Sequence, residues 1–122
     1  MKPLLLFILA AVSLIAADAT GTWTGSLIIV QDGAEQSRPA HLVLKQEGTK
    51  VTGTAGPDES EQHVIKNGEV SDGTITFSVP REEFDMKFTL KQDGDEIKGE
   101  ITRERNGRRE TAKVILKRSP GA

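Results

Sequence analysis

The strongest constraint on the fold of this chain is an alternation of apolar and polar residues with a period of two. Residues 74–79 read TITFSV and residues 86–91 read MKFTLK, and similar patterns occupy 42–45, 97–102 and 112–117. Such alternation places one set of side chains on a buried face and the other set in water. After residue 20 no segment shows a sustained helical period, so the sequence predicts an all-β domain with essentially no helix.

Glycine-containing pairs separate these segments and predict tight turns. Asp-Gly pairs lie at 32–33, 72–73 and 93–94, Asn-Gly lies at 106–107, and Glu-Gly lies at 47–48. Asp-Gly and Asn-Gly supply the positive φ angles that two-residue hairpin turns require. Strands are therefore expected at about residues 21–30, 40–46, 50–56, 62–70, 74–81, 84–92, 96–105 and 108–118. Polar loops are expected at 31–39 and 55–62.

An internal repeat supports this arrangement. Residues 42–53 read LVLKQEGTKVTG, and residues 88–99, which lie 46 positions further on, read FTLKQDGDEIKG. Each copy describes a hairpin whose single apolar face cannot be hidden alone, so several hairpins must share one core. About eight antiparallel strands can do this by closing into an up-and-down meander barrel, which removes the exposed edges.

The first 19 residues have the layout of a secretory signal peptide. Lys2 precedes an apolar run from residue 4 to residue 17, and the small residues Ala17 and Ala19 flank Asp18. The run is shorter than the roughly 20 residues needed to span a bilayer. We therefore expect a signal peptide at 1–19, cleavage after Ala19, and a single domain at 20–122 that is exported to the periplasm or secreted, without stable membrane insertion.

The composition excludes several classes of function. The chain has no cysteine, which excludes disulfides, cysteine nucleophiles and thiolate zinc sites. Its formal net charge is −2, which argues against general nucleic-acid binding. No GxSxG, HExxH, P-loop or CxxC motif occurs. The two histidines, His41 and His63, do not by themselves indicate a metal site. We therefore expect a non-enzymatic protein without cofactor or metal.

The start of the domain resembles the calycins, the superfamily of lipocalins, fatty-acid-binding proteins and avidins. Residues 20–25 read TGTWTG, which places a Gly-x-Trp on the first strand, and residues 51–54 read VTGT. In its overall sequence pattern the chain is most similar to small exported bacterial proteins with lipocalin-like barrels and no assigned activity. The resemblance implies that Trp23 closes one barrel end beneath Lys117 or Arg118. With one Trp and no Tyr, biotin binding is not expected.

An eight-stranded barrel is just wide enough to be filled by side chains or to hold one small ligand. We expect a filled core and a protein that binds through its outer surface and its loops at 31–39 and 55–62. The alternative is a carrier of a small apolar ligand bound near Trp23, Phe77, Met86 and Phe88. A solvent-open void above about 300 Å³ would favour the carrier. The expected inward set is Leu27, Ile29, Leu42, Leu44, Val51, Val64, Ile75, Phe77, Val79, Met86, Phe88, Leu90, Ile97, Ile101, Val114 and Leu116.

Charge is distributed unevenly along the chain. Acidic residues outnumber basic residues in 58–96, and the reverse holds in 98–118. Four arginines, Arg103, Arg105, Arg108 and Arg109, flank the turn at 106–107. The simplest explanation is pairing of charges across neighbouring strands, each exposed pair being worth about 0–1 kcal/mol. The functional alternative is a basic hairpin tip that binds an anionic surface or a protein partner.

Overall fold

The computed structural model describes residues 18–119, except for the side chains of Gln31 and Arg105. Within this range the chain forms nine strands and no helix, as the alternation predicts. The strands are β1 (Gly21–Gln31), β2 (Ala34–Glu47), β3 (Lys50–Asp58), β4 (Glu61–Val64), β5 (Lys66–Ser71), β6 (Thr74–Pro80), β7 (Asp85–Asp93), β8 (Glu96–Arg105) and β9 (Arg108–Arg118).

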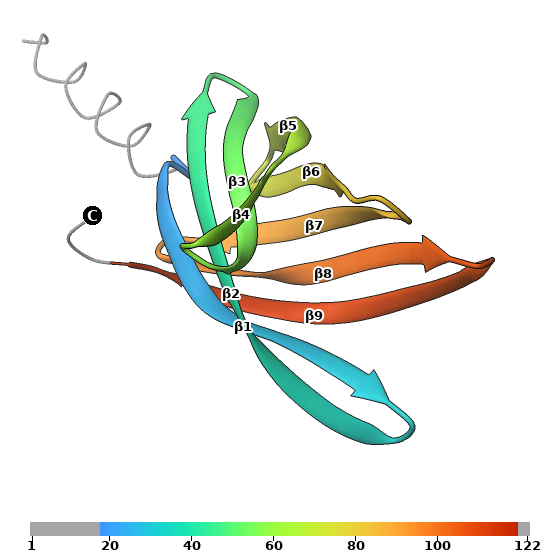
Figure 1. The fold of residues 1–122 in the computed structure, drawn as a ribbon. Coiled ribbons are helices and arrows are strands. Elements are labelled where there is room, and N and C mark those ends of the chain that lie inside the picture. Colours follow the sequence, from blue (N-terminus) through green and yellow to red (C-terminus); the bar gives the residue numbers. More distant parts are fainter. Residues whose placement is uncertain (1–17, 120–122) are drawn as a thin grey trace, which may run out of the picture.

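The strands form a closed, eight-stranded antiparallel barrel (Figure 1). Each strand pairs with the next strand in the chain, except that β4 does not pair with β5, and β9 pairs with β1, which closes the ring. Nine strands fill eight positions because β4 and β5 share the place beside β3. β5 pairs with the beginning of β3, and β4 pairs with its end. Barrel closure removes most free edges without a disulfide.

The single strand expected at 62–70 is wrong, because the chain breaks between β4 and β5. Ile65 lies at the break, and its backbone N–H donates to the Gly53 carbonyl at 3.0 Å. The pairing register shifts before the break, between Ala55 and Asp58 of β3, and again after it, between Lys66 and Glu69 of β5, so one alternation does not run through residues 62–70. As a result Ile65 is 5% exposed and belongs to the core, whereas Val64, which was expected to face inward, is 63% exposed.

The loops expected at 31–39 and 55–62 are also largely strand. β2 begins at Ala34, thirteen positions before its end at Glu47, and its first half pairs only with β1. The turn between β1 and β2 is reduced to Asp32 and Gly33, which have φ angles of 52° and 79°. β3 likewise extends to Asp58, and β4 begins at Glu61. The segment 34–39 lacks alternation because both of its faces are exposed.

The two sequence repeats form hairpins of the same register. In β2–β3 the residue opposite Leu44 is Gly53, and in β7–β8 the residue opposite Leu90 is Gly99. A Cβ atom at Gly53 would lie 1.9 Å from a backbone oxygen of β2, and one at Gly99 would lie 2.2 Å from the equivalent oxygen of β7. The strands therefore approach too closely at these points for any side chain.

The core is a single cluster of buried apolar side chains inside the barrel. Most of the expected inward set is buried, from Leu42 and Leu44 on β2 to Val114 and Leu116 on β9. Leu27, Ile29 and Met86 are only partly buried, and all three lie toward the same end of the barrel. Packing is therefore complete at one end and incomplete at the other.

The predicted signal peptide lies outside the described residues apart from Asp18 and Ala19, which lie against the barrel. In the range 18–119 there is no helix of the length and apolarity that crossing a membrane demands.

Candidate functional site

Trp23 fills one end of the barrel, which we call the closed end. Its side chain is 0% exposed, and the guanidinium carbon of Arg118 lies 4.4 Å from the centroid of its ring. The calycin resemblance led us to expect a basic partner at Lys117 or Arg118, and Arg118 is that partner. A cation over an indole ring is worth about 0.5–1 kcal/mol when exposed and about 2 kcal/mol when desolvated.

Residues 18–20 cover Trp23 and are bonded to several strands. The indole N–H of Trp23 donates to the Ala19 carbonyl at 2.9 Å, and the Ala19 amide donates to Gln46 at 2.9 Å. The Asp18 carbonyl accepts from Gln92 at 3.2 Å and from Arg118 at 3.1 Å. Gln46 and Gln92 are equivalent positions of the two repeats, so both copies bind this segment. Ala19 is 0% exposed.

The Asp18 carboxylate completes the closed end. The Thr20 hydroxyl donates to it at 2.6 Å and the Thr20 amide at 2.8 Å. The hydroxyl bond, then the amide bond and the charge of Arg118 lower the pKa of Asp18 below its ordinary value, against the opposing effect of burial.

The strands separate at the opposite end, which we call the open end. Pairing between β1 and β9 stops at Ile28 and Lys113, although both strands continue. Pairing between β2 and β3 stops at His41 and Gly56. Two hairpin arms therefore extend past the ring, one at residues 29–40 and one at residues 104–112, and Figure 1 shows them diverging. The side chains of Leu27, Ile29 and Met86 at this end are only partly buried.

A hollow of about 310 Å³ lies at the open end. Its inner wall is apolar and is provided by Leu27, Ile29, Leu42, Val79, Met86, Phe88 and Ile101. Phe77 lies behind Phe88, with ring centroids 4.5 Å apart and the planes inclined by 22°. Ala55 and Gly56 of β3 also line it, so small residues leave part of this space unfilled. The barrel is thus filled near Trp23 and hollow near Met86.

The rim of the hollow is polar and mostly basic. Arg38 from β2, Arg81 from the turn after β6 and Arg103 from β8 line it together with Glu61 and His63 of β4. Arg38 and Arg81 are exposed and make no side-chain hydrogen bond or ion pair with any residue in 18–119. The entrance of the hollow, which we call the mouth, is therefore mostly basic, and the interior below it is apolar.

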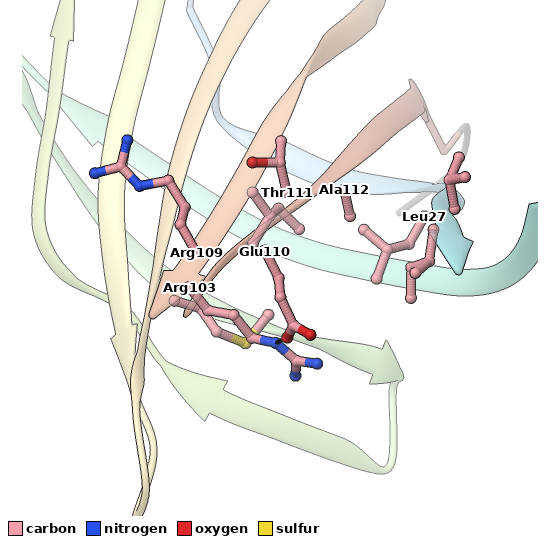
Figure 2. A pocket seen from close by; sticks show the side chains of 10 residues that line it. Leu27, Arg103, Arg109, Glu110, Thr111 and Ala112 are labelled. Carbon is pink, nitrogen blue, oxygen red and sulfur yellow. Dashed lines mark hydrogen bonds and ion pairs between the residues drawn. The ribbon is translucent and has the colours of Figure 1, made fainter. Parts of the chain in front are cut away.

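Arg103 is already engaged by neighbours in the structure. Its Nε donates to Glu110 at 2.5 Å, and its guanidinium carbon lies 5.0 Å from the Phe84 ring centroid. Arg103 and Glu110 also line a second hollow of about 290 Å³ beside the 104–112 arm (Figure 2). The two hollows share Leu27, Ile29, Met86, Ile101 and Arg103, so they adjoin.

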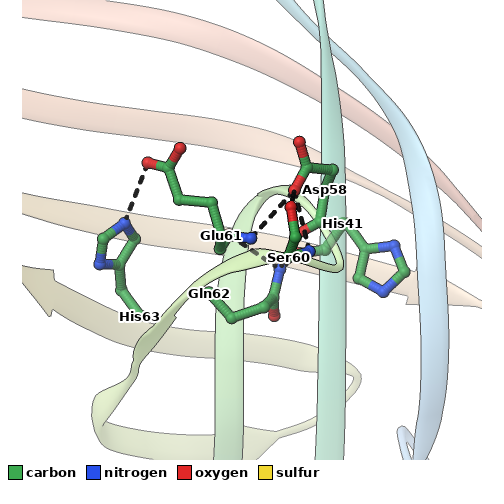
Figure 3. A network of polar contacts seen from close by, with 6 residues as sticks. All are labelled: His41, Asp58, Ser60, Glu61, Gln62 and His63. Atoms are coloured by element: carbon green, nitrogen blue, oxygen red, sulfur yellow. Dashed lines mark hydrogen bonds and ion pairs between the residues drawn. The ribbon is translucent and has the colours of Figure 1, made fainter.

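A polar network holds the β3–β4 turn beside the mouth (Figure 3). The Asp58 carboxylate accepts from the Ser60 hydroxyl at 2.8 Å and from the Ser60 and Glu61 amides at 2.9 Å each. The bond from the Ser60 hydroxyl, followed by those from the Glu61 and Ser60 amides, lowers the pKa of Asp58 below its ordinary value. This turn therefore fixes β4 and keeps Glu61 and His63 at the rim.

Gln62 fastens the same turn to the barrel wall. Its amide nitrogen donates to the His41 carbonyl at 3.1 Å and to the Asp58 carbonyl at 2.8 Å. Its amide oxygen accepts from the Thr54 hydroxyl at 2.6 Å. β4 is therefore held against β2 and β3 although no pairing with β6 supports it.

The chain matches no protein-family model, no curated protein and no solved structure.

The structure separates the four residues expected to bind a ligand. Met86 and Phe88 line the larger hollow, and Phe77 supports Phe88 from behind. Trp23 lies at the closed end, where Arg118 and Ala19 cover it. The apolar pair at the open end and the Trp at the closed end therefore do not form one site.

The four arginines expected to bind a partner lie in or beside the 104–112 arm. Arg103 lines both hollows, Arg109 lines the smaller one, and Arg108 is exposed near the turn. Arg105 pairs with Arg108 in the backbone register, and its side chain lies outside the described part of the structure. Arg103 is balanced by Glu110, so pairing across strands accounts for part of this basic cluster.

Sequence reasoning missed Arg38, Arg81 and Phe84. Arg38 lies in a segment expected to be a loop, and Arg81 lies at the end of an expected strand. No local pattern marks either residue, because their proximity arises from the closure of the ring. Among residues 18–119 no group of three or more His, Cys, Asp or Glu side chains is placed to hold a metal ion.

Proposed function

We propose that this protein is an exported, non-enzymatic binding protein of lipocalin-like fold that carries one small, mainly apolar molecule in the hollow at its open end. The observation that carries the proposal is the hollow of about 310 Å³ with its apolar wall. This volume exceeds the value of about 300 Å³ above which we expected a carrier. It lies near the lower end of the range for small-molecule sites, about 300–1,000 Å³.

The packing supports a carrier more than a protein that acts by its outer surface alone. Leu27, Ile29 and Met86 line the hollow and are only partly buried. An apolar ligand would remove this surface from water. This removal would favour binding by about 25 cal/mol for each Å² of apolar surface buried. The closed end would keep the ligand from passing through the barrel, since Trp23 and residues 18–20 occupy it.

Export and the lipocalin-like assignment rest on the sequence. The apolar run at residues 4–17 supports export, and the Gly-x-Trp motif with a Trp plug beneath Arg118 supports the calycin resemblance. An exported barrel without disulfides depends on its core for stability. A carrier of this kind retains that core at one end and offers space at the other.

Binding of a neutral apolar fluorophore, N-phenyl-1-naphthylamine, tests the proposal. We expect one molecule to bind per chain with a rise in fluorescence. Leu27→Trp should weaken binding at least about tenfold, because the larger side chain enters the hollow that the probe would fill. The matched control is Thr76→Trp, an exposed position on β6, which should bind like the unaltered protein. Equal affinity of both variants, or no binding at all, would overturn the carrier.

A further inference from the structure

One edge of β9 has no strand beside it where β9 extends past the ring. Pairing of β9 with β1 stops at Lys113, whereas its pairing with β8 continues back to its first residue. In an antiparallel strand, alternate residues direct their backbone groups to opposite sides. The Ser119 amide bonds to the Thr22 carbonyl of β1, so the odd-numbered residues of β9 face the β1 side. The N–H and C=O groups of Arg109 and Thr111 therefore lie at an open edge, without a partner among residues 18–119.

The other arm also has an open edge, but a proline protects it. β2 pairs only with β1 from Ala34 to Ala40. Thr22 directs its backbone groups toward β9, so its register partner Val43 faces away from β1, as does Pro39 four positions earlier. The missing N–H of Pro39 thus lies at the open edge of β2, where it disfavours the addition of a further strand. The open edge of β9 contains no proline.

An apolar hollow lies beside the open edge of β9. Its volume is about 290 Å³, and Arg109, Thr111 and Ala112 line it together with Val30 of β1. Leu27 and Ile101 provide part of its apolar wall, and Val30 is 65% exposed. A strand added at this edge would direct alternate side chains toward the hollow.

The charge beside the open edge is positive. Arg109 and Lys113 lie on the outer face of β9, and both are exposed. Each has a glutamate opposite it on β8, yet neither makes an ion pair with a residue in 18–119. Figure 2 shows the Arg109 side chain directed away from the pair formed by Arg103 and Glu110. Carboxylates on the outer side of an added strand would therefore meet unpaired cations.

We propose that β9 binds an extended acidic segment of another protein, which adds as an antiparallel strand along Arg109 and Thr111. The segment takes the position that β1 leaves after Ile28, and main-chain hydrogen bonds hold it there. Its residues opposite Arg109 and Thr111 face outward and carry carboxylates. Its residue opposite Ala112 places an apolar side chain in the hollow. The preferred sequence therefore alternates acidic and apolar residues, and this inference does not depend on the carrier function.

A second copy of this chain would fit the same edge less well. Two β9 edges paired antiparallel about Glu110 would place this residue opposite its own copy. They would also bring the two Arg109 side chains together on the outer face. Like charges that face each other across strands are destabilising. An acidic segment places opposite charges there instead.

Fluorescence polarisation with labelled peptides tests strand addition. The probe is a peptide of about seven residues that alternates glutamate and valine, which is the length of an ordinary strand. A peptide with lysine in place of glutamate should bind about tenfold or more weakly. N-methylation of the glutamates should weaken binding about tenfold or more, because their N–H groups face β9. N-methylation of the valines, whose N–H groups face the other side, should be tolerated.

Two variants at Thr111 form a matched pair. Thr111→Pro removes an N–H from the open edge and none from the pairing with β8, so circular dichroism should show a folded barrel. Its affinity for the glutamate peptide should fall about tenfold or more. Thr111→Val keeps the N–H and should bind like the unaltered protein. Arg109→Glu should reverse the preference between the glutamate and lysine peptides.

Equal affinity for the two N-methylated peptides would overturn strand addition. Equal affinity for the glutamate and lysine peptides would overturn the acidic class, and the absence of any binding by the glutamate peptide would overturn the whole proposal. Analytical ultracentrifugation covers the remaining occupant. A dimer that Thr111→Pro dissociates would assign the edge to a second copy and overturn the acidic segment, whereas a monomer in both proteins agrees with the proposal.

Discussion

The two ends of the barrel use the same strands, yet one is packed and the other is hollow. At the closed end every strand has two neighbours, and the side chains of Trp23, Ile97 and Leu116 are fully buried. At the open end the β1–β9 and β2–β3 pairings stop while the strands continue, and Leu27 and Met86 remain partly exposed. The difference shows that strand pairing, more than composition, decides where this barrel is filled.

The largest expected effect comes from removing the plug. Trp23→Ala should lower the free energy of unfolding by about 3–5 kcal/mol, because it creates a cavity, removes the ring that Arg118 lies over and removes the donor to the Ala19 carbonyl. Phe84→Ala at the open end should cost less, since Phe84 is only partly buried. Urea unfolding of both variants measures the contrast, and equal losses would show that the two ends do not differ in packing.

The next largest loss of stability is expected at Gly99, where β8 lies against β7 in the second repeat. Gly99→Ala should destabilise the protein by about 1–3 kcal/mol, because the added methyl would lie 2.2 Å from a backbone oxygen of β7. Ser78→Ala on β6 is the control and should be near neutral. Thermal unfolding followed by circular dichroism provides the measurement. Unchanged stability of Gly99→Ala would mean that the strands can separate at this point as easily as they do at the open end.

Acid should loosen the closed end through Asp18. Its pKa is lowered in the folded state, so its stabilising contribution is present above the ordinary pKa of about 4 and is lost as the pH falls through the folded value. The side chain is partly exposed, so we expect less than about 1 kcal/mol. Asp18→Asn should be slightly less stable than the unaltered protein at pH 7 and equal to it near pH 2. A difference independent of pH would contradict this assignment.

The smallest effect is expected at the tip of the 104–112 arm. Arg108→Ala with Arg109→Ala should elute from a heparin column at slightly lower salt, because exposed charges contribute to attraction but make no ion pair with a described residue. The matched control is Lys91→Ala with Lys117→Ala, two exposed residues that also make no ion pair with a described residue. A large shift in elution would favour a protein that acts through its outer surface. Equal elution of the two double variants would show that the arm does not contribute to heparin binding.

Much of the barrel follows from the sequence because alternation and turn chemistry are local. The segments at 74–79 and 86–91 alternate strictly and form β6 and β7. The Asp72-Gly73 and Asn106-Gly107 turns have positive φ at both residues, as their composition predicts. The plug was anticipated only through the calycin resemblance, since no pattern in the chain connects Trp23 with Arg118.

The remaining features depend on contacts between distant residues. The first half of β2 has polar residues on both faces, so its strand character is set by pairing with β1. The break between β4 and β5 lies at Ile65, whose backbone N–H bonds to the Gly53 carbonyl, and no pattern in the sequence predicts it. The hollow exists because two arms diverge beyond the ring, and Arg38 and Arg81 meet there only after the ring has closed.

The location of the two chain ends has a practical consequence. Asp18 bonds to Arg118 at the closed end, and the Ser119 amide donates to the Thr22 carbonyl at 2.7 Å, so both ends of the described chain lie near Trp23. Figure 1 shows the start of β1 and the end of β9 on the same side of the barrel. A tether or fusion partner attached at either end would therefore point away from the mouth. The protein can be immobilised on a sensor through either end of the described chain with the hollow at the open end facing the solution.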